Sequence, residues 1–269
     1  MPCYNIHVPK KRLDIIMVER GLVDSRALAQ RLVMAGEVRV DGQIALKPSI
    51  QIFENAQIEI EQSAPFVSRG GEKLAAALDA FQIDVSQLVC ADVGASTGGF
   101  TDCMLQNGAA RVYAIDVGKG ILHWKLRKDA RVVVMEDTNS RYLDHMPEPP
   151  ALVTIDVSFI SLKILLPVVK GWFSPDKAYP GQIIALIKPQ FEAGRTAATH
   201  GQGVIRDPQI HRQVLHDVLE YSLEFGYGVQ GLMRSPIMGP KGNIEFFVHW
   251  IYPGDSSPIE TMITPLFDS

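Results

Sequence analysis

DVGASTGGF, residues 92–100, is the most informative stretch of this 269-residue chain. It follows the apolar segment 88–91 and precedes a helical segment that begins near Phe100. Glycines in such a turn permit positive φ angles and let a ligand approach the helix N-terminus without meeting a Cβ atom. An ordinary strand-to-helix turn has the same composition, so the turn alone indicates only a possible ligand crevice.

Further strand-like segments lie on both sides of this turn. Each is short, unalternated and rich in Val, Ile or Leu, which is typical of strands covered on both faces in a mostly parallel sheet. The expected strands are residues 88–91, 112–115, 132–135, 152–155, 183–187, 228–233 and 245–251. Helical stretches separate them, so the pattern predicts a Rossmann-like α/β domain with a mostly parallel sheet.

Acidic residues follow the next two strands. Asp116 ends strand 112–115, where a carboxylate can accept hydrogen bonds from ribose hydroxyls, and Asp137 follows strand 132–135, where we expect it to receive an adenine amino group. Ligands of open α/β sheets bind beyond the carboxyl ends of the strands. S-adenosylmethionine suits this crevice better than NAD, because it has a ribose and an adenine but no pyrophosphate.

A lysine and an aspartate follow two further strands. Asp156 ends strand 152–155, and Lys188 ends strand 183–187 just before Pro189. A ribose hydroxyl is a poor nucleophile, so an enzyme that methylates it must position the hydroxyl and help to remove its proton. A lysine can take that part. A structural salt bridge is the alternative explanation of the same two residues.

The first sixty-odd residues have the pattern of a small separate α+β module. Residues 13–61 predict two helices, a hairpin and a short last strand. In the second helix, Leu28, Leu32 and Ala35 are expected to face the core. We expect a domain over residues 1–62, a linker over 63–67 and a larger domain over 68–269.

This module resembles the RNA-binding domain first seen in ribosomal protein S-four. The resemblance rests on RLD (residues 12–14), GLVDSR (21–26) and AGEVRVDG (35–42). It implies that RNA phosphates are contacted by Arg12, Arg26, Arg31, Arg39 and Lys47. The alternative is that these side chains are solvated charges, interleaved with Asp14, Glu19 and Glu37.

The second part resembles the FtsJ-like RNA 2′-O-methyltransferases, which share a Lys-Asp-Lys-Glu tetrad. The motifs are SRGGEKL (residues 68–74), TIDVSF (154–159), IKPQF (187–191) and KGNIEF (241–246), and they supply Lys73, Asp156, Lys188 and Glu245. Together with the N-terminal module, the pattern is similar to the TlyA family, whose members are named both as haemolysins and as ribosomal RNA 2′-O-methyltransferases.

The resemblance implies S-adenosylmethionine as cofactor and ribosomal RNA or ribosomal subunits as partner. It implies that Lys188 acts on the 2′-hydroxyl, that Asp156 and Glu245 orient it, and that Lys73 completes the network and contacts substrate. The implied cofactor-binding residues are Gly94, Ser96, Gly98, Phe100, Asp116, Asp137 and Asp156. The glycine turn carries Ser96-Thr97 where FtsJ relatives often have Ala-Pro, so contacts at those two positions differ from the family pattern.

Composition and charge limit the other functional interpretations of the sequence. The net charge of −4 means that any RNA contact must come from local basic patches. The three cysteines have no metal-ligand spacing, no apolar run approaches the length of a membrane span, and no signal peptide is evident, so we expect a cytoplasmic protein without a metal. A membrane-acting haemolysin and an RNA-binding protein with a vestigial methyltransferase fold remain as alternatives.

Two further features have open roles. Residues 190–208 form a long loop after Lys188, in which Arg195, His200 and Arg206 can meet phosphate if the loop is more than a connector. Trp124 has basic neighbours; we expect it to pack in the core, with base stacking as the alternative.

Overall fold

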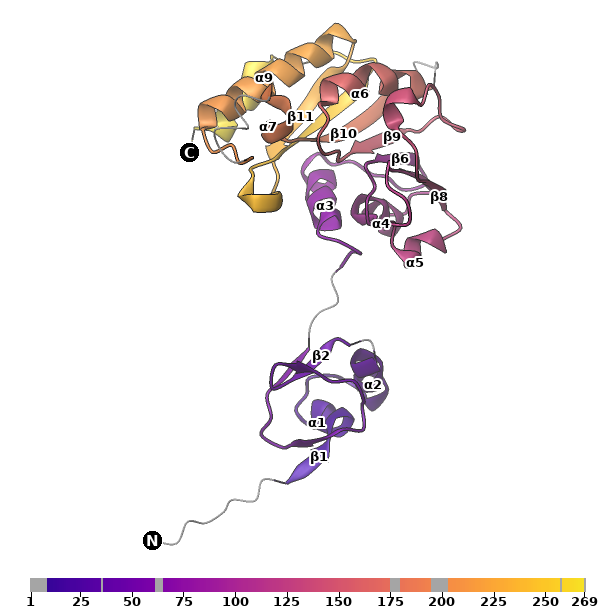
Figure 1. Ribbon diagram of the computed structural model, residues 1–269, viewed down its shortest axis with the longest axis vertical. Helices are drawn as coiled ribbons and strands as arrows, with labels where there is room; N and C mark the ends of the chain where they lie inside the picture. The colour runs from indigo at the N-terminus through magenta and orange to yellow at the C-terminus, as the bar shows by residue number, and fades with distance from the viewer. Residues whose placement is uncertain are drawn as a thin grey trace. The chain divides into compact units, whose positions relative to one another are not determined.

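The computed structural model describes residues 9–34, 36–60, 65–174, 180–194, 203–256 and 258–268 (Figure 1). The chain divides into two compact units, Met1–Pro65 and Phe66–Ser269. Phe66 and Val67, which we placed in the expected linker, belong to the second unit.

The first unit consists of short helices and strands. They are β1 (Lys10–Arg12), α1 (Leu13–Glu19), α2 (Arg26–Met34), β2 (Val38–Val40), β3 (Gln43–Ile44), β4 (Gln51–Phe53) and β5 (Ile58–Ile60). Strand β1 pairs with β4, and β2 pairs with both β3 and β5, all antiparallel. The expected helices, hairpin and last strand are therefore present. Strands β1 and β4 were not expected, because their sequences KKR and QIF lack the apolar–polar–apolar alternation of β2 and β5.

Helix α2 turns a different stripe towards the core than we expected. Ala29 and Val33 are buried, whereas Leu28 and Leu32 are only partly buried against the same cluster. Residues four apart share a helix face, so Ala29 and Val33 form the centre of the stripe and the leucines form its edge. Ala35 lies outside the described residues.

The second unit is built on a seven-stranded sheet. Its strands are β6 (Val89–Val93), β7 (Arg111–Ile115), β8 (Val132–Met135), β9 (Leu152–Ile155), β10 (Gly181–Ile187), β11 (Gly228–Arg234) and β12 (Phe246–Tyr252). Their spatial order is β11-β12-β10-β9-β6-β7-β8, and β12 is antiparallel to both of its neighbours. The Rossmann-like, mostly parallel sheet is confirmed, and no expected strand end differs by more than two residues.

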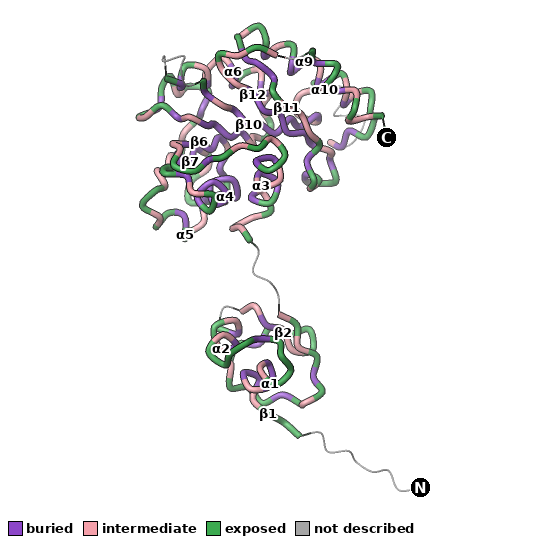
Figure 2. Tube along the Cα trace, turned by 180° about the vertical axis from the view of Figure 1, so that it is seen from behind, coloured by how far each residue is buried: buried purple, intermediate pink, exposed green. Residues whose placement is uncertain are grey.

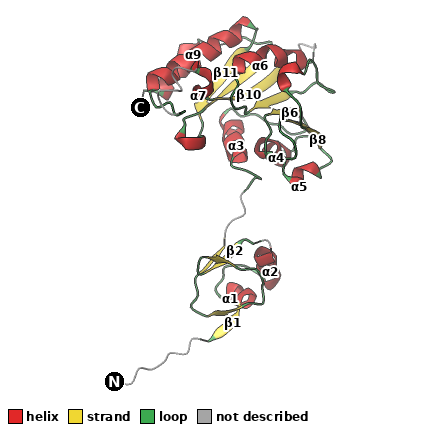
Figure 3. Cartoon of the chain, in the orientation of Figure 1, coloured by secondary structure: helices red, strands yellow, loops and turns green. Residues whose placement is uncertain are grey.

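Helices cover both faces of this sheet (Figures 1 and 3). They are α3 (Gly70–Ala80), α4 (Gly99–Gln106), α5 (Trp124–Arg127), α6 (Leu162–Val169), α7 (Pro189–Glu192), α9 (Pro208–Glu224) and α10 (Ile259–Ile263), with single 3-10 turns at Ser140–Tyr142, Lys170–Trp172, Pro240–Gly242 and Thr264–Leu266. Helices α3, α4 and α5 pack on one face, where Leu74, Met104 and Leu126 are buried. Helices α6, α9 and α10 pack on the other. The strands between these layers are mostly buried (Figure 2), which explains their unalternated apolar sequences.

The antiparallel strand β12 brings a distant part of the chain to the site. Ile187 at the end of β10 is the register partner of Phe246 at the start of β12. The start of β12 therefore lies at the edge where the parallel strands end. Lys188, Asp156 and Glu245 flank strand ends at this one edge.

Candidate active site

Lys188 and Asp156 form an ion pair at the ends of the neighbouring parallel strands β10 and β9. The distance from Lys188 Nζ to Asp156 Oδ1 is 2.6 Å, and the Lys188 side chain is only 10% exposed. The same ammonium group donates a hydrogen bond of 3.3 Å to Ser158 Oγ. Neighbouring parallel strands end side by side, so the adjacency expected from the sequence is present.

Lys73 and Glu245 form a second ion pair, between the first turn of α3 and the start of β12. Lys73 Nζ lies 2.6 Å from Glu245 Oε2, and the Glu245 side chain is 0% exposed. Glu245 Oε1 is also buried and has no hydrogen-bond partner within the described part of the chain. The Lys73 ammonium therefore compensates a carboxylate that is almost completely removed from water.

Both ion pairs line one cavity of about 490 Å³ together with the glycine turn. Its lining includes Lys73, Asp156, Lys188, Glu245, Gly94, Ser96 and Phe100. The structure thus brings together the whole tetrad and part of the expected cofactor set. Ser68, Arg69, Met238 and Gly239 also line the cavity, and sequence reasoning missed them.

The glycine turn is shaped by positive φ angles and close approaches. Gly94 has φ +83°, and a Cβ atom there would lie 2.6 Å from the backbone oxygen of Asp156. Gly98 has φ +97°, and its Cβ atom would lie 2.2 Å from Leu126 Cδ1. Gly98 lines neither this cavity nor its neighbour. It faces Leu126 of α5 and closes the turn, and its expected place in the cofactor site stays a prediction.

A second cavity of about 410 Å³ adjoins the first and shares Gly94, Ser96, Asp156 and Ser158 with it. Asp116 lines this cavity. Its carboxylate accepts hydrogen bonds from the backbone N–H groups of Ser96, at 2.8 Å, and Gly118, at 2.7 Å. Asp116 thereby fixes the glycine turn to the end of β7.

Asp137 departs from expectation. It is exposed, has φ +54°, and lines neither cavity. The preceding residue Glu136 accepts hydrogen bonds from the backbone N–H groups of Gly120 and Leu122, and these bonds hold the pKa of its carboxyl well below its usual range. The chain after β8 instead presents Thr138, Asn139, Ser140 and Arg141 to the second cavity. A run of polar residues directly after a strand is the sequence signal that could have identified them as site residues.

A third cavity shares Ser158, Lys188 and Glu245 with the first. It is lined by Lys188, Phe159, Phe191, Gln190, Lys241 and Asn243, among others. Phe159 is 88% exposed, and its ring centroid lies 4.9 Å from that of Phe191. Its φ angle of +65° is rare for a bulky residue. Sequence reasoning missed Phe159, although it belongs to the TIDVSF motif.

Asp92 is buried at the end of β6, beneath the glycine turn. It accepts hydrogen bonds from Thr101 Oγ1, at 2.7 Å, and from Thr154 Oγ1, at 3.0 Å. Burial raises its pKa to about 6 despite these hydrogen bonds. The carboxyl is part of the support of the turn and lines none of the cavities described above.

In the first unit, two of the expected RNA-binding arginines have a structural partner. Arg12 and Arg26 both bind Asp14, which is completely buried and also accepts a hydrogen bond from Gln30. The hydrogen bonds from Arg12, Gln30 and Arg26 hold the pKa of the Asp14 carboxyl well below its usual range. Asp14 is therefore no solvated charge.

The side chains of the other expected RNA-binding residues form fewer hydrogen bonds and ion pairs. The side chains of Arg31 and Lys47 are exposed and make no hydrogen bond or ion pair with other described residues. Arg39 donates a hydrogen bond to the backbone oxygen of Gly42.

The long loop after Lys188 is described only in part. Arg206 is exposed, whereas Arg195 and His200 lie outside the described residues. Across the described ranges, no helix has the length and apolarity that crossing a membrane requires, and no group of three His, Cys, Asp or Glu side chains is placed to hold a metal.

Comparison with known proteins agrees with this geometry. Residues 66–252 match the FtsJ-like methyltransferase family, and residues 11–58 match the S4 domain family. The chain is 43% identical to the 16S/23S rRNA (cytidine-2′-O)-methyltransferase TlyA of Mycobacterium tuberculosis, over 90% of each chain. It is 40% identical to Hemolysin A of Brachyspira hyodysenteriae, over 89% of this chain and 99% of that protein.

A solved structure shares the architecture of the whole chain. It is described as a candidate hemolysin from Streptococcus thermophilus, and it is 41% identical, with a TM-score of 0.70 over 96% of each chain. The family match, the two-part architecture and these identities all lead to one assignment. The chain belongs to the FtsJ-like methyltransferases, in the family that includes TlyA and Hemolysin A, and carries an N-terminal S4 domain.

Proposed function

We propose that the protein transfers the methyl group of S-adenosylmethionine to a ribose 2′-hydroxyl of ribosomal RNA. One observation carries the proposal: the Lys188–Asp156 pair lines the same cavity as the glycine turn and the Lys73–Glu245 pair. The family supplies methyl transfer, and the name of the TlyA relative specifies a cytidine 2′-oxygen of ribosomal RNA.

The two adjoining cavities fit S-adenosylmethionine. Gly94 approaches the backbone of Asp156 too closely for a Cβ atom, which keeps the passage between the cavities free of a side chain. The ligand would be held by Gly94, Ser96, Phe100, Asp116 and Asp156. When bound, it supplies an electrophilic methyl group on a sulfonium.

Lys188 is the residue that acts on the nucleophile. In the reaction, a bond forms between the ribose O2′ and the methyl carbon, the bond from that carbon to sulfur breaks, and the O2′ proton must leave. Lys188 orients the hydroxyl oxygen and, in its neutral amine form, receives this proton; the ammonium that results is the form paired with Asp156 in the structure. Glu245 fixes Lys73, which contacts the substrate on the other side of the cavity.

The third cavity suits the base of the target nucleotide. Phe159 and Phe191 present aromatic rings beside Lys188, and a base drawn out of an RNA helix is commonly held by stacking. A base in this cavity would place its own ribose next to Lys188. The S4 domain, expected over residues 1–62, would supply phosphate contacts through Arg31, Arg39 and Lys47, and residues 68–269 would supply catalysis.

Transfer of tritium from methyl-labelled S-adenosylmethionine to ribosomal RNA or subunits from cells that lack this gene tests the proposal. We expect incorporation into RNA that depends on Lys188. A protein that binds no S-adenosylmethionine in calorimetric titration, with or without RNA, contradicts it. Lysis of liposomes at low protein concentration, equally by wild type and Lys188→Ala, would instead favour the haemolysin function.

A further inference from the structure

An exposed tryptophan lies beside the cofactor turn. Trp124, the first residue of α5, is 64% exposed, so the packing role expected from the sequence is wrong. The other tryptophans, Trp172 and Trp250, are 1% and 0% exposed. A single exposed apolar side chain is normal on a protein surface, so the charges beside Trp124 decide what it can bind.

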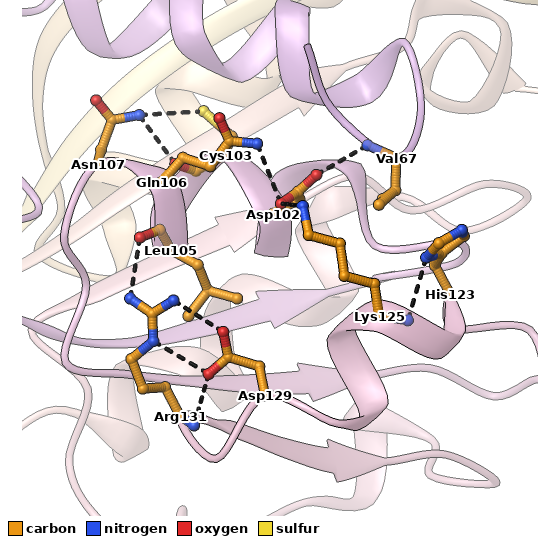
Figure 4. A network of polar contacts seen from close by, with 10 residues as sticks. All are labelled: Val67, Asp102, Cys103, Leu105, Gln106, Asn107, His123, Lys125, Asp129 and Arg131. Atoms are coloured by element: carbon orange, nitrogen blue, oxygen red, sulfur yellow. Dashed lines mark hydrogen bonds and ion pairs between the residues drawn. The ribbon is translucent and has the colours of Figure 1, made fainter. Parts of the chain in front are cut away.

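A cationic side chain contacts the Trp124 ring. Lys128 Nζ lies 5.1 Å from the Trp124 ring centroid, within the range of a cation–π contact. Lys128 forms no ion pair with any other described residue. The neighbouring Lys125 is held by Asp102, 3.5 Å away (Figure 4), so it contributes less free charge.

Two acidic groups near this surface already form ion pairs. Asp129 pairs with Arg131 at 2.8 Å (Figure 4), and Glu136 pairs with Arg127. Neither of these two carboxylates is left to pair with Lys128.

The segment that carries Trp124 is firmly attached to the glycine turn. The backbone N–H of His123 donates a hydrogen bond of 3.1 Å to the oxygen of Thr97, which lines the first cavity. Leu122 and Leu126 pack against Gly98 so closely that a Cβ atom there would overlap both. Trp124 is thus held on the outer side of the cofactor turn and does not belong to any of the cavities.

We propose that Trp124, with Lys128, forms a stacking platform for an unpaired nucleotide of the RNA substrate, distinct from the nucleotide that is methylated. The inference rests on the proposed function, which makes RNA the ligand of this unit. An indole ring accepts any base on its face, and the adjacent lysine attracts a phosphate. Because the whole chain has a net charge of −4, such a local patch is needed to draw RNA to this edge.

The tryptophan itself reports on this binding. Since the two other tryptophans are buried, iodide should quench mainly the Trp124 emission of the full-length protein. Titration with single-stranded oligocytidylate is expected to quench the same emission and to protect it from iodide. A Trp124 that iodide cannot reach before RNA is added, or emission that RNA leaves unchanged, would overturn the proposal.

Variants distinguish the contribution of base stacking to RNA binding from the contribution of charge. Trp124→Ala is expected to weaken oligonucleotide binding about tenfold, whereas Trp124→Tyr keeps most of the affinity, because stacking is worth this much per base. Lys128→Gln should lower the salt dependence of binding by about one counterion. Equal binding by Trp124→Ala and wild type, with unchanged thermal unfolding, would refute the platform.

The methyl-transfer assay distinguishes this inference from the function on which it rests. If wild type and Trp124→Ala methylate ribosomal RNA equally well at limiting RNA, the platform fails and the proposed function stands. If wild type transfers no methyl group, the proposed function fails. If Trp124→Ala loses binding to ribosomal proteins but not to oligonucleotides, the surface contacts protein and the platform is wrong.

Discussion

Gly239 and Glu245 approach each other so closely that a Cβ atom at position 239 would lie 2.0 Å from Glu245 Oε1. The absence of a side chain at Gly239 is therefore a condition for the position of the Glu245 carboxylate, which in turn holds Lys73 at 2.6 Å. This turn precedes β12 and closes one side of the first cavity.

Gly239→Ala is expected to lower the rate of methyl transfer at least tenfold, because the Glu245 carboxylate must move and the Lys73 ion pair with it. Gly242→Ala is the matched control in the same turn. A Cβ atom at Gly242 meets nothing within 4 Å, although its φ of +81° adds strain of about 1 kcal/mol. Steady-state rates and melting temperatures of both variants check this; equal rates would remove the link between Gly239 and Glu245.

Asp92 makes the stability of the second unit depend on pH. Its folded-state pKa of about 6 lies above its unfolded value, so its carboxyl favours folding most below about pH 4, and this contribution is lost as the pH rises through 6. The loss is on the order of 3 kcal/mol. Asp92→Asn should make the free energy of unfolding, measured with urea, less dependent on pH between pH 4 and pH 7. Asn in place of the exposed Asp79 should leave that pH dependence unchanged. An equally steep dependence in Asp92→Asn would contradict the burial argument.

The basic residues of the S4 domain are expected to separate into two kinds. Arg31→Gln with Lys47→Gln should weaken RNA binding and reduce its salt slope by about two counterions, without lowering the melting temperature. Arg12→Gln should instead destabilise the domain, since it removes a partner of the buried Asp14 carboxylate. Filter binding at several salt concentrations and hydrogen exchange of residues 13–34 check both. A normal salt slope in the double variant would exclude Arg31 and Lys47 as phosphate contacts.

Phe159→Ala is expected to raise KM for RNA and to lower kcat, with little effect on the binding of S-adenosylmethionine. The ring is 88% exposed, so its removal should leave the melting temperature within about 1 °C. Phe159→Tyr is the control that keeps the aromatic face. Unchanged kinetics in Phe159→Ala would mean that the target base does not stack in the third cavity.

The sheet could be predicted from the sequence because its strands are buried on both faces. Segments such as Val132–Met135 and Leu152–Ile155 are apolar throughout, and their ends coincide with the strands of the structure. The adjacency of Asp156 and Lys188 followed from the same pattern, since ligand groups of parallel sheets gather at the carboxyl ends. The position of Lys73 depended on family motifs, because no local pattern brings a residue of α3 to Glu245.

Features that depend on three-dimensional contacts could not be predicted. Asp137 follows a strand, as Asp116 does, yet it lines neither cavity, and the residues just after it line the second cavity instead. Gly98 belongs to the glycine turn but faces Leu126. Asp14 looks like a surface charge in the sequence, and only the fold shows that two arginines surround it in the core.

The central claim is that Lys188 serves methyl transfer to a ribose 2′-oxygen. Its most direct test is alkaline hydrolysis of ribosomal RNA methylated in vitro, since a 2′-O-methyl group makes the adjacent phosphodiester bond resistant. We predict alkali-resistant labelled dinucleotides with wild type and with the control Lys163→Ala, and a loss of at least 100-fold with Lys188→Ala, as expected for removal of a group that handles the proton. Label that alkali releases only as mononucleotides, or equal labelling by Lys188→Ala, would contradict the account.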